Sequence, residues 1–250
     1  MTESMSASSA AARWEKPPVE QYQLGAAVQV WRVSVRQTPQ QLRDAAEMLS
    51  DTEHIQARRF RQPADRDRYV AAHGALRIIL GRYLNEVPAQ IRFVSGAQGK
   101  PGLAPEFQAS GLRFNLAHSG DWALLAVTGR REVGVDVEQF QPLPEAAPIA
   151  ERHFAPEELA ALADLTTDER PAVFFHIWAC KEAFIKATGL GLSYPLREFS
   201  VPLRPMTERP VPVQTGSSQT WGLMRLAPGA GYAGAVVAEG VDWDLRLWQF

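Results

Sequence analysis

Alternating side chains mark the first element of regular structure, the segment VQVWRVSV at residues 28–35. This period of two predicts a β-strand. The pattern turns helical over residues 38–56, and apolar residues recur at helical spacing over 65–84, so two helices are expected to follow the strand. Apolar segments bounded by glycine then predict three short strands, at residues 91–96, 112–120 and 122–129.

The same order of elements begins again after Gly129. A strand is predicted over residues 132–140, a helix over 156–165, and then a long helix that runs to residue 187. Three more strands are expected, at residues 199–203, 221–226 and 232–239. The proline-rich stretch 201–213 is expected to form a loop or an edge strand, because proline cannot donate a hydrogen bond to a sheet ladder.

This repeated order predicts two α/β lobes of about 120 residues each, a usual size for a domain, with a cleft between them. No residue-level repeat accompanies it, so the similarity of the lobes rests on element order alone. We place the N-terminal lobe at residues 19–130 and the C-terminal lobe at residues 131–250. Residues 1–18 are polar and rich in Ser and Ala, and they are expected to be a disordered tail.

Composition and charge limit the possible partners. The 250 residues are 46% hydrophobic and 22% charged, which is ordinary for a soluble globular protein. A net charge of −2 argues against nucleic acid or an anionic membrane as a partner, so local positive charge must bind any anionic ligand. The single cysteine, Cys180, excludes an internal disulfide and fits a reducing compartment. Since membrane-span and signal-peptide patterns are also missing, we expect a cytoplasmic protein.

Two carboxylates share one face of the strand predicted over residues 132–140. Side chains alternate along a strand, so Asp136 and Glu138 point one way while Val135 and Val137 point the other. Oxygen ligands at this spacing suit a hard cation such as Mg²⁺. The alternative is a half-buried strand with charges that face solvent, and the short D-x-E pattern alone favours that alternative.

The long helix carries a second group of charges within WACKEAFIKATG, residues 178–189. Trp178, Glu182 and Lys186 form one stripe on this helix, opposite an apolar face. Glu182 and Lys186 alone would be a solvated ion pair worth a few tenths of a kcal/mol. Trp178 argues against that interpretation, because a large aromatic side chain on the stripe indicates that it faces the other lobe or a ligand.

Further candidate residues lie in the first half. Five arginines fall within eleven residues and would either bind phosphate through their guanidinium groups or form a soluble connection between helices; they are Arg58, Arg59, Arg61, Arg66 and Arg68. The turn GKP exposes Lys100. His118 and Ser119 follow at a strand end, where loops often carry function, although a lone histidine is more often structural.

The order and wording of these motifs resemble the Sfp-type 4'-phosphopantetheinyl transferases, the two-lobed enzymes that load carrier proteins. The resemblance rests on RRF at 58, GKP at 99, FNLAHSG at 114, VGVDVE at 133 and WACKEAFIKATGLGLS at 178, and continues through FSV at 199 and GYAGAVVA at 231. It covers about residues 45–240. The pair G-x-D-x-E and W-x-x-K-E-x-x-x-K is specific, whereas either half alone is weak.

The resemblance implies an α+β fold of two similar lobes related by a pseudo-twofold axis. Each lobe would be a small, mostly antiparallel sheet with packed helices, and the active site would lie in the cleft between them. The implied reaction transfers the 4'-phosphopantetheine arm of coenzyme A to a serine hydroxyl of an apo carrier protein and releases 3',5'-ADP. Such a reaction mainly requires neutralisation of pyrophosphate charge and positioning of the nucleophile.

Residue roles also follow from the resemblance. Asp136, Glu138 and Glu182 would hold Mg²⁺, which bridges the pyrophosphate oxygens. Glu182 would accept the serine proton, either directly or through a water bound to the metal. Lys186 would contact phosphate and the leaving 3',5'-ADP, and Lys181 would assist it.

The N-terminal lobe would contribute the rest of the coenzyme site. His118, Ser119, Lys100 and Pro101 are expected to bind phosphates across the cleft, and Arg68 corresponds to a nucleotide contact. Family members often carry lysines just before the R-R-F motif, but Glu53 and Gln56 occupy those places here. The resemblance therefore implies that Arg58, Arg59 or Arg61 binds the 3'-phosphate instead.

The expected partners are coenzyme A and an apo acyl or peptidyl carrier protein, with no nucleic acid and no membrane. Carriers are small and acidic, and the family docks them beside the segment after the K-E helix, here about residues 187–215. Its apolar and basic side chains suit a modest interface; they are Leu190, Leu192, Tyr194, Leu196, Arg197 and Arg204. Two-lobed members of the family usually act as monomers.

Two other functions stay open at this point. One is a Mg²⁺-dependent phosphodiesterase, in which carboxylates and a lysine assist attack by water. Nucleases with an E-x-K pattern place both residues on one strand, whereas Glu182 and Lys186 are four apart on a helix. The other is a non-catalytic module that binds coenzyme A or a carrier protein, in which neutralising Asp136 or Glu182 would remove no turnover.

Overall fold

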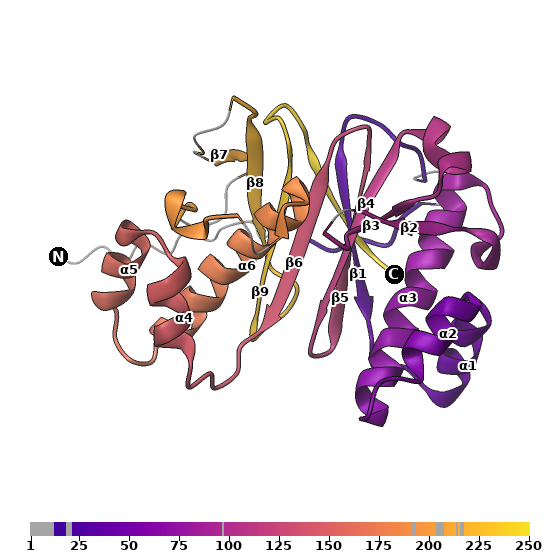
Figure 1. Cartoon of the computed structure of the whole chain (residues 1–250), viewed down its shortest axis with the longest axis horizontal. Helices are drawn as coiled ribbons and strands as arrows, with labels where there is room; N and C mark the ends of the chain where they lie inside the picture. Colours follow the sequence, from indigo (N-terminus) through magenta and orange to yellow (C-terminus); the bar gives the residue numbers. More distant parts are fainter. Residues whose placement is uncertain are drawn as a thin grey trace.

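The computed structural model describes residues 13–18, 22–96, 98–191, 194–203, 208–213, 215 and 218–250. Two four-stranded sheets pack together at the centre of the molecule, and helices cover their outer faces (Figure 1). The predicted fold of two α+β lobes is confirmed, because each lobe is an antiparallel-rich sheet packed with helices. No helix within these described ranges is long and apolar enough to cross a membrane.

In the N-terminal lobe one long helix packs on the sheet, and two shorter helices pack against that helix. Its elements are β1 (Val28–Ser34), α1 (Pro39–Glu47), α2 (Asp51–Ala57), α3 (Pro63–Leu84), a 3-10 turn η1 (Pro88–Gln90), β2 (Phe93–Ser95), β3 (Pro101–Leu103), η2 (Pro105–Ser110), β4 (Leu112–Ser119) and β5 (Trp122–Gly129). β1, β5 and β4 pair antiparallel, while β2 and β3 form a separate ribbon. Trp31, Leu76 and Leu125 belong to the buried cluster that joins α3 to this sheet.

The C-terminal lobe repeats this plan with α6 against its sheet. Its elements are β6 (Val133–Gln139), α4 (Ala146–His153), α5 (Pro156–Ala163), α6 (Arg170–Thr188), η4 (Leu196–Glu198), β7 (Val211–Val213), β8 (Trp221–Leu226) and β9 (Tyr232–Glu239). The strands run antiparallel in the order β6-β9-β8-β7. The proline-rich stretch thus supplies an edge strand at β7, while residues 204–207 of that stretch lie outside the described part of the chain.

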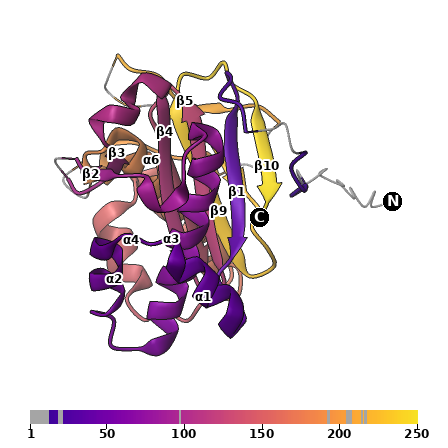
Figure 2. The same ribbon diagram turned by 90° about the vertical axis from the view of Figure 1, so that its right-hand side faces the viewer.

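The last strand returns to the first lobe. β10 (Leu245–Gln249) pairs in parallel with β1 and completes the N-terminal sheet, as Figure 2 shows, whereas the sequence places residues 131–250 in the C-terminal lobe. Part of the expected tail also packs here, because the N–H of Glu15 donates to Leu247 O at 3.1 Å. Residues 1–12 of that tail lie outside the described ranges. Both ends of the described chain are therefore tied to β10.

Two other expectations differ from the structure. The single helical stretch over residues 38–56 is divided into α1 and α2, because Ser50 caps α2 and its N–H donates to Glu53 Oε2 at 2.9 Å. The strand expected over residues 199–203 is wrong, since side chains bind its backbone groups. Phe199 O accepts a hydrogen bond from a buried lysine at 2.8 Å, and the N–H of Val201 donates to a glutamate at 2.8 Å.

Strand β6 and helix α6 approach each other closely at Gly134. A Cβ atom at this position would lie 2.1 Å from Ala183 O and 2.3 Å from the N atom of Ala187. Both atoms belong to the backbone of α6, so a flexible side chain cannot give way. Only glycine allows this spacing, which brings the charged side of α6 against the carboxylate side of β6.

We expect Gly134→Ala to lower the free energy of unfolding by about 3 kcal/mol, because the added methyl group must push α6 away from β6. Urea denaturation of both proteins measures the difference. Gly25→Ala is the matched control, since a Cβ atom there meets nothing within 4 Å. Equal stability of the Gly134→Ala and Gly25→Ala variants would contradict the proposed close packing.

Candidate active site

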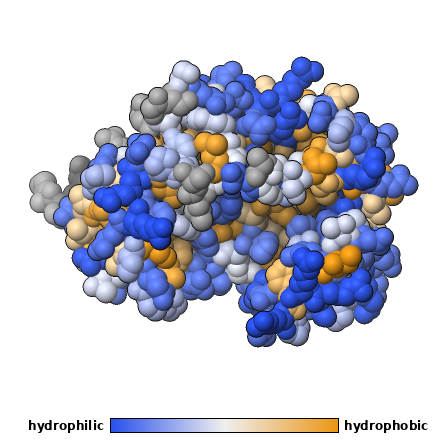
Figure 3. Space-filling model, viewed as in Figure 1, coloured by the Kyte–Doolittle hydropathy of each residue, from blue (hydrophilic) through white to orange (hydrophobic). Residues whose placement is uncertain are grey.

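The two lobes meet where β4 runs beside β6. Oδ1 of the buried Asn115 accepts a hydrogen bond from the N–H of Val135 at 2.8 Å. At the end of β4, Ser119 Oγ accepts from the N–H of Gln139 and donates to Glu138 Oε2, each at 3.1 Å. These bonds fix the end of β4 beside the carboxylate strand, and Figure 3 shows the surface hollowed between the lobes.

The carboxylate pair of β6 faces α6. Val135 and Val137 pack between the two sheets, so Asp136 and Glu138 lie on the opposite face, as the strand period predicts. Lys186 Nζ donates to Oδ1 of the buried Asp136 at 2.5 Å. Oδ2 is buried and has no hydrogen-bond partner within the described residues. Burial raises the pKa of Asp136 even though Lys186 opposes the shift.

Three carboxylates influence the charge of Lys186, and one of them, Asp136, contacts it. Burial, followed by the charge of Asp136, raises the pKa of Glu138 to about 7. Burial also raises the pKa of Glu182. Burial alone would lower the pKa of Lys186, but Asp136, Glu182 and Glu138 raise it instead. The single positive charge of Lys186 therefore faces three acidic side chains, and a further positive charge would be favourable here.

The donor chemistry of this site fits a hard divalent cation. Carboxylate oxygens are the ligands that Mg²⁺ prefers, and within the described residues Oδ2 of Asp136 accepts no hydrogen bond. Across the residues that the structure describes, no three acidic, histidine or cysteine side chains are already gathered closely enough to form a metal site. Asp136, Glu138 and Glu182 are thus fitting ligands that stand apart.

His118 brings an imidazole from the N-terminal lobe to the same place. Its side chain is exposed at the end of β4, yet the surrounding protein desolvates the ring and lowers its pKa. The charges of His73, Lys186 and Arg68 lower it further. Charged residues of α3, in the same lobe, and of α6, in the other lobe, therefore both influence the His118 ring.

A cavity of about 670 Å³ opens beside His118 in the N-terminal lobe. Its lining comes from α2, α3, β2 and β4, and its volume is within the usual range of small-molecule sites. A smaller cavity of about 320 Å³ reaches Glu182 and Lys186. Pro101 and Asn115 line both cavities, so a long ligand can extend from the N-terminal lobe to the carboxylates.

A larger cavity lies elsewhere, in the C-terminal lobe. Its volume is about 880 Å³, and helices α4, α5 and α6 form most of its apolar lining. Its lining contains none of the side chains that we selected from the sequence. Size alone therefore does not identify the reactive site, whereas the gathering of charged side chains does.

Lys181 does not belong to the phosphate site, contrary to expectation. It is fully buried, and its Nζ lies 2.9 Å from Glu158 Oε2. The same Nζ donates to Leu196 O at 2.7 Å and to Phe199 O at 2.8 Å. All three donors are used inside the C-terminal lobe, so we assign Lys181 to holding the loop that follows α6.

Lys100 makes contacts within the protein as well as lining a cavity. Its Nζ donates to Val133 O at 3.0 Å, to Glu132 Oε2 at 3.1 Å and to Ala187 O at 3.3 Å. These acceptors occupy the ammonium group and join the GKP turn to the other lobe. Lys100 and Pro101 both line the smaller cavity with Glu182 and Lys186, and Pro101 also lines the larger one.

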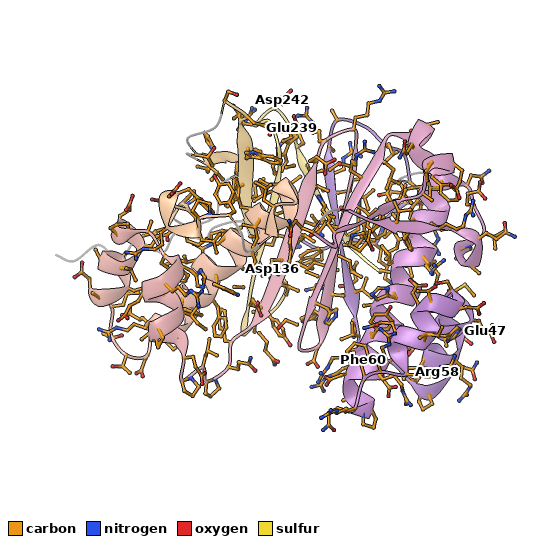
Figure 4. All side chains as sticks on the ribbon, in the orientation of Figure 1. Glu47, Arg58, Phe60, Asp136, Glu239 and Asp242 are labelled. Carbon is orange, nitrogen blue, oxygen red and sulfur yellow. The ribbon has the colours of Figure 1, made fainter. Side chains whose placement is uncertain are left out.

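The arginines divide into two groups. Arg58 and Arg59 are exposed, donate to His54 O and Gln56 Oε1 of α2, and do not line the cavity beside His118. Figure 4 shows Arg58 well away from Asp136. Arg68 instead pairs with its neighbour Asp65 at 2.6 Å and influences His118. Of these arginines, Arg68 is the one near the reactive groups.

Trp178 does not face the other lobe or a ligand cavity. Its ring packs edge-on against His153 with centroids 5.8 Å apart, and stacks on Phe174 at 6.4 Å. Both partners belong to the C-terminal lobe. The expectation for this side chain is therefore wrong, and Trp178 connects α6 with the end of α4.

Sequence reasoning also missed a cluster at the back of the cavity. Glu53, His73 and Arg77 lie together there, with Glu53 Oε2 2.6 Å from Arg77 Nε. The pattern S-x-x-E at residues 50–53 is a capping-box signal that marks Glu53 as a structural carboxylate. No sequence pattern indicated that α3 would place His73 and Arg77 beside it.

The fold and the site are typical of a two-lobed enzyme, with carboxylates, a lysine and a histidine beside ligand-sized cavities. Residues 132–233 match the family model of the 4'-phosphopantetheinyl transferase superfamily. Residues 33–130 match the model described as 4'-phosphopantetheinyl transferase, N-terminal. The two matches cover both lobes.

Relatives agree with the family models. The chain is 38% identical over 237 residues to the 4'-phosphopantetheinyl transferase HetI of Nostoc sp., which covers 95% of this chain and 98% of the relative. It is 34% identical over 200 residues to psf-1 of Bacillus pumilus, 76% and 83% of the two chains. Sfp of Bacillus subtilis is 34% identical over 155 residues, 62% of this chain and 66% of its own.

The chain belongs to the 4'-phosphopantetheinyl transferase family, as the sequence motifs predicted. Its activity is the transfer of 4'-phosphopantetheine from coenzyme A to carrier proteins. Membership favours this transfer over the phosphodiesterase and the non-catalytic module.

Replacing Lys181 by Met is expected to lower the free energy of unfolding by about 3 kcal/mol, because Glu158 then stays buried without a partner. The affinity for 3',5'-ADP should not change, since Lys181 does not reach the cavities. Urea denaturation and calorimetric titration below the melting temperature measure the two effects. Weaker nucleotide binding at unchanged stability would return Lys181 to the phosphate site.

Proposed function

We propose that this enzyme performs a Mg²⁺-dependent transfer in the cleft where β4, β6 and α6 meet. One observation carries the proposal: Lys186 pairs with Asp136 of β6 and, with Glu182, lines a cavity that shares Pro101 and Asn115 with the larger cavity beside His118. Coenzyme A needs such an elongated site. Its nucleotide would occupy the N-terminal cavity, and its pyrophosphate would reach Lys186.

Metal binding belongs to this proposal. Asp136, Glu138 and Glu182 would hold Mg²⁺, which supplies positive charge to the pyrophosphate oxygens. Ser119 has a different role from the expected phosphate contact, because its hydroxyl donates to Glu138 and keeps that carboxylate in place. The ligands come from two elements whose spacing Gly134 sets.

The remaining groups position the reactants. The carrier serine oxygen forms a bond to the phosphorus that bears the pantetheine arm, and the bond to 3',5'-ADP breaks. Lys186 and Arg68 would balance phosphate charge, while His118, with its lowered pKa, would donate a hydrogen bond as a neutral ring. The half-buried Glu182 would accept the serine proton, directly or through one water molecule.

Carrier docking is proposed beside the segment after α6, within residues 187–215. Leu190 and Leu203 are 47% and 40% exposed, and Arg197 is exposed, which gives an apolar surface with a basic rim. Leu196 is buried, so the expectation that it contributes to this surface is wrong. Two other expected contacts, Leu192 and Arg204, lie outside the described residues.

We also propose that one chain is sufficient. Asp136, Glu182, Lys186 and His118 all come from the same polypeptide, so no second copy is needed to complete the cleft. A monomer in the cytoplasm, where coenzyme A and apo carriers are available, fits this arrangement.

Incubation with coenzyme A, Mg²⁺ and a panel of apo acyl and peptidyl carrier proteins should increase the mass of at least one carrier by the mass of the phosphopantetheine arm. Intact-protein mass spectrometry measures the gain. A carrier in which the acceptor serine is replaced by Ala is the control and should gain nothing. Absence of any gain with folded enzyme would refute the proposed function.

Asp136→Ala and Glu182→Ala should each reduce the transfer rate by about 100-fold or more, since each removes charge that neutralises the pyrophosphate site. Glu138→Gln should be milder, because an amide oxygen can still bind a cation. Asp242→Ala is the control, as this exposed carboxylate lies away from Asp136 in Figure 4. Near-normal turnover by Asp136→Ala would refute the assigned metal site.

A further inference from the structure

Glu53 is a buried carboxylate that lines the cavity beside His118, and its partners show its role. Its Oε2 accepts hydrogen bonds from Arg77 Nε at 2.6 Å, from Ser50 Oγ at 2.8 Å and from Ser50 N–H at 2.9 Å. Its Oε1 lies 3.2 Å from His73 Nδ1. Burial alone would raise the pKa of Glu53, but the bonds from His73 and Ser50 and the charge of Arg77 lower it to about 2.

An ionised Glu53 determines which nitrogen of His73 carries the proton. A carboxylate only accepts hydrogen bonds, so Nδ1 of His73 must donate to Oε1. The ring of His73 also stacks on Tyr69, with centroids 3.9 Å apart and planes 25° apart. The carboxylate and the tyrosine together fix the tautomer and the plane of the imidazole.

The other nitrogen of His73 is left for a ligand. Within the described residues Nε2 has no hydrogen-bond partner and is not a buried atom, and 22% of the side chain is exposed. His73 and His118 both line the cavity of about 670 Å³. The charge of His73 lowers the pKa of His118, so the two imidazoles lie close to each other.

Two arginines, Arg77 and Arg92, line this cavity, and each is paired with a glutamate. Arg77 compensates Glu53 and donates its remaining bonds to Pro88 O and Ile91 O, at 2.8 and 2.9 Å. Asp51 also lines the cavity but is exposed. Arg58, Arg59 and Arg61, the other candidates for the 3'-phosphate, do not line the cavity.

We propose that His73, positioned by Glu53, binds the 3'-phosphate of coenzyme A through Nε2. The inference rests on the proposed function, because it places the nucleotide in this cavity. A monoester phosphate has a second pKa of about 6, so it can share one proton with an imidazole near neutral pH. The pyrophosphate of the coenzyme has no such proton, which is why the chemistry favours the 3'-phosphate.

The test compares coenzyme A with dephospho-coenzyme A, which lacks only the 3'-phosphate. Calorimetric titration measures both affinities for the wild type and for two variants. His73→Asn keeps an amide near the Nδ1 position and loses Nε2, whereas His73→Gln places an amide near the Nε2 position. His73→Asn should bind coenzyme A about tenfold more weakly and dephospho-coenzyme A with unchanged affinity. His73→Gln should lose less.

Thermal melting of each variant shows whether it is folded, and Arg58→Ala and Arg59→Ala are the controls. Neither control should alter the preference of the enzyme for coenzyme A over dephospho-coenzyme A. Equal weakening of both ligands by His73→Asn, or loss of the preference in an arginine control alone, would overturn the role of His73. Failure of the wild type to bind coenzyme A or to load any carrier would instead refute the proposed function.

Discussion

The contact between strand β6 and helix α6 is the constraint on which the site depends. At Gly134 the two backbones are too close for any side chain. This spacing brings Oδ1 of Asp136 to 2.5 Å from Nζ of Lys186. A wider spacing would separate the carboxylates of the strand from those of the helix. The acidic site thus follows from a steric requirement two residues before its first carboxylate, and its electrostatics follow from its packing.

Cleft enzymes usually need a rigid relation between their halves, and here polar groups maintain it. Asn115 binds the backbone of β6, and Lys100 reaches Val133 and Ala187 across the boundary. Buried polar groups must be satisfied, so each of these bonds selects one relative placement of the lobes. Residues that resemble ligand contacts in the sequence therefore have a second use, which is to hold the ligand-binding surfaces in register.

Sequence patterns predicted the strands and helices well where side chains pack periodically. The alternation in β6 and the motif in α6 indicated Asp136, Glu138, Glu182 and Lys186, because strand and helix periods determine facing. Lys181 was misjudged because nothing local reveals that Glu158, distant in sequence, will meet it in the core. Lys181 and Glu158 also bind the backbone of residues 199 and 201, so the strand expected there does not form. A single sequence does not reveal which buried charges, far apart along the chain, will pair in the core.

The parallel pairing of β10 with β1 affects how the protein is made. One strand of the first sheet follows the entire second lobe in sequence, so a ribosome must synthesise the second lobe before the first sheet is complete. Until then β1 exposes an unpaired edge, the kind of surface on which other strands can assemble. The two lobes are therefore distinct in the folded structure but cannot fold independently. The first lobe needs a strand that follows the second lobe in the sequence.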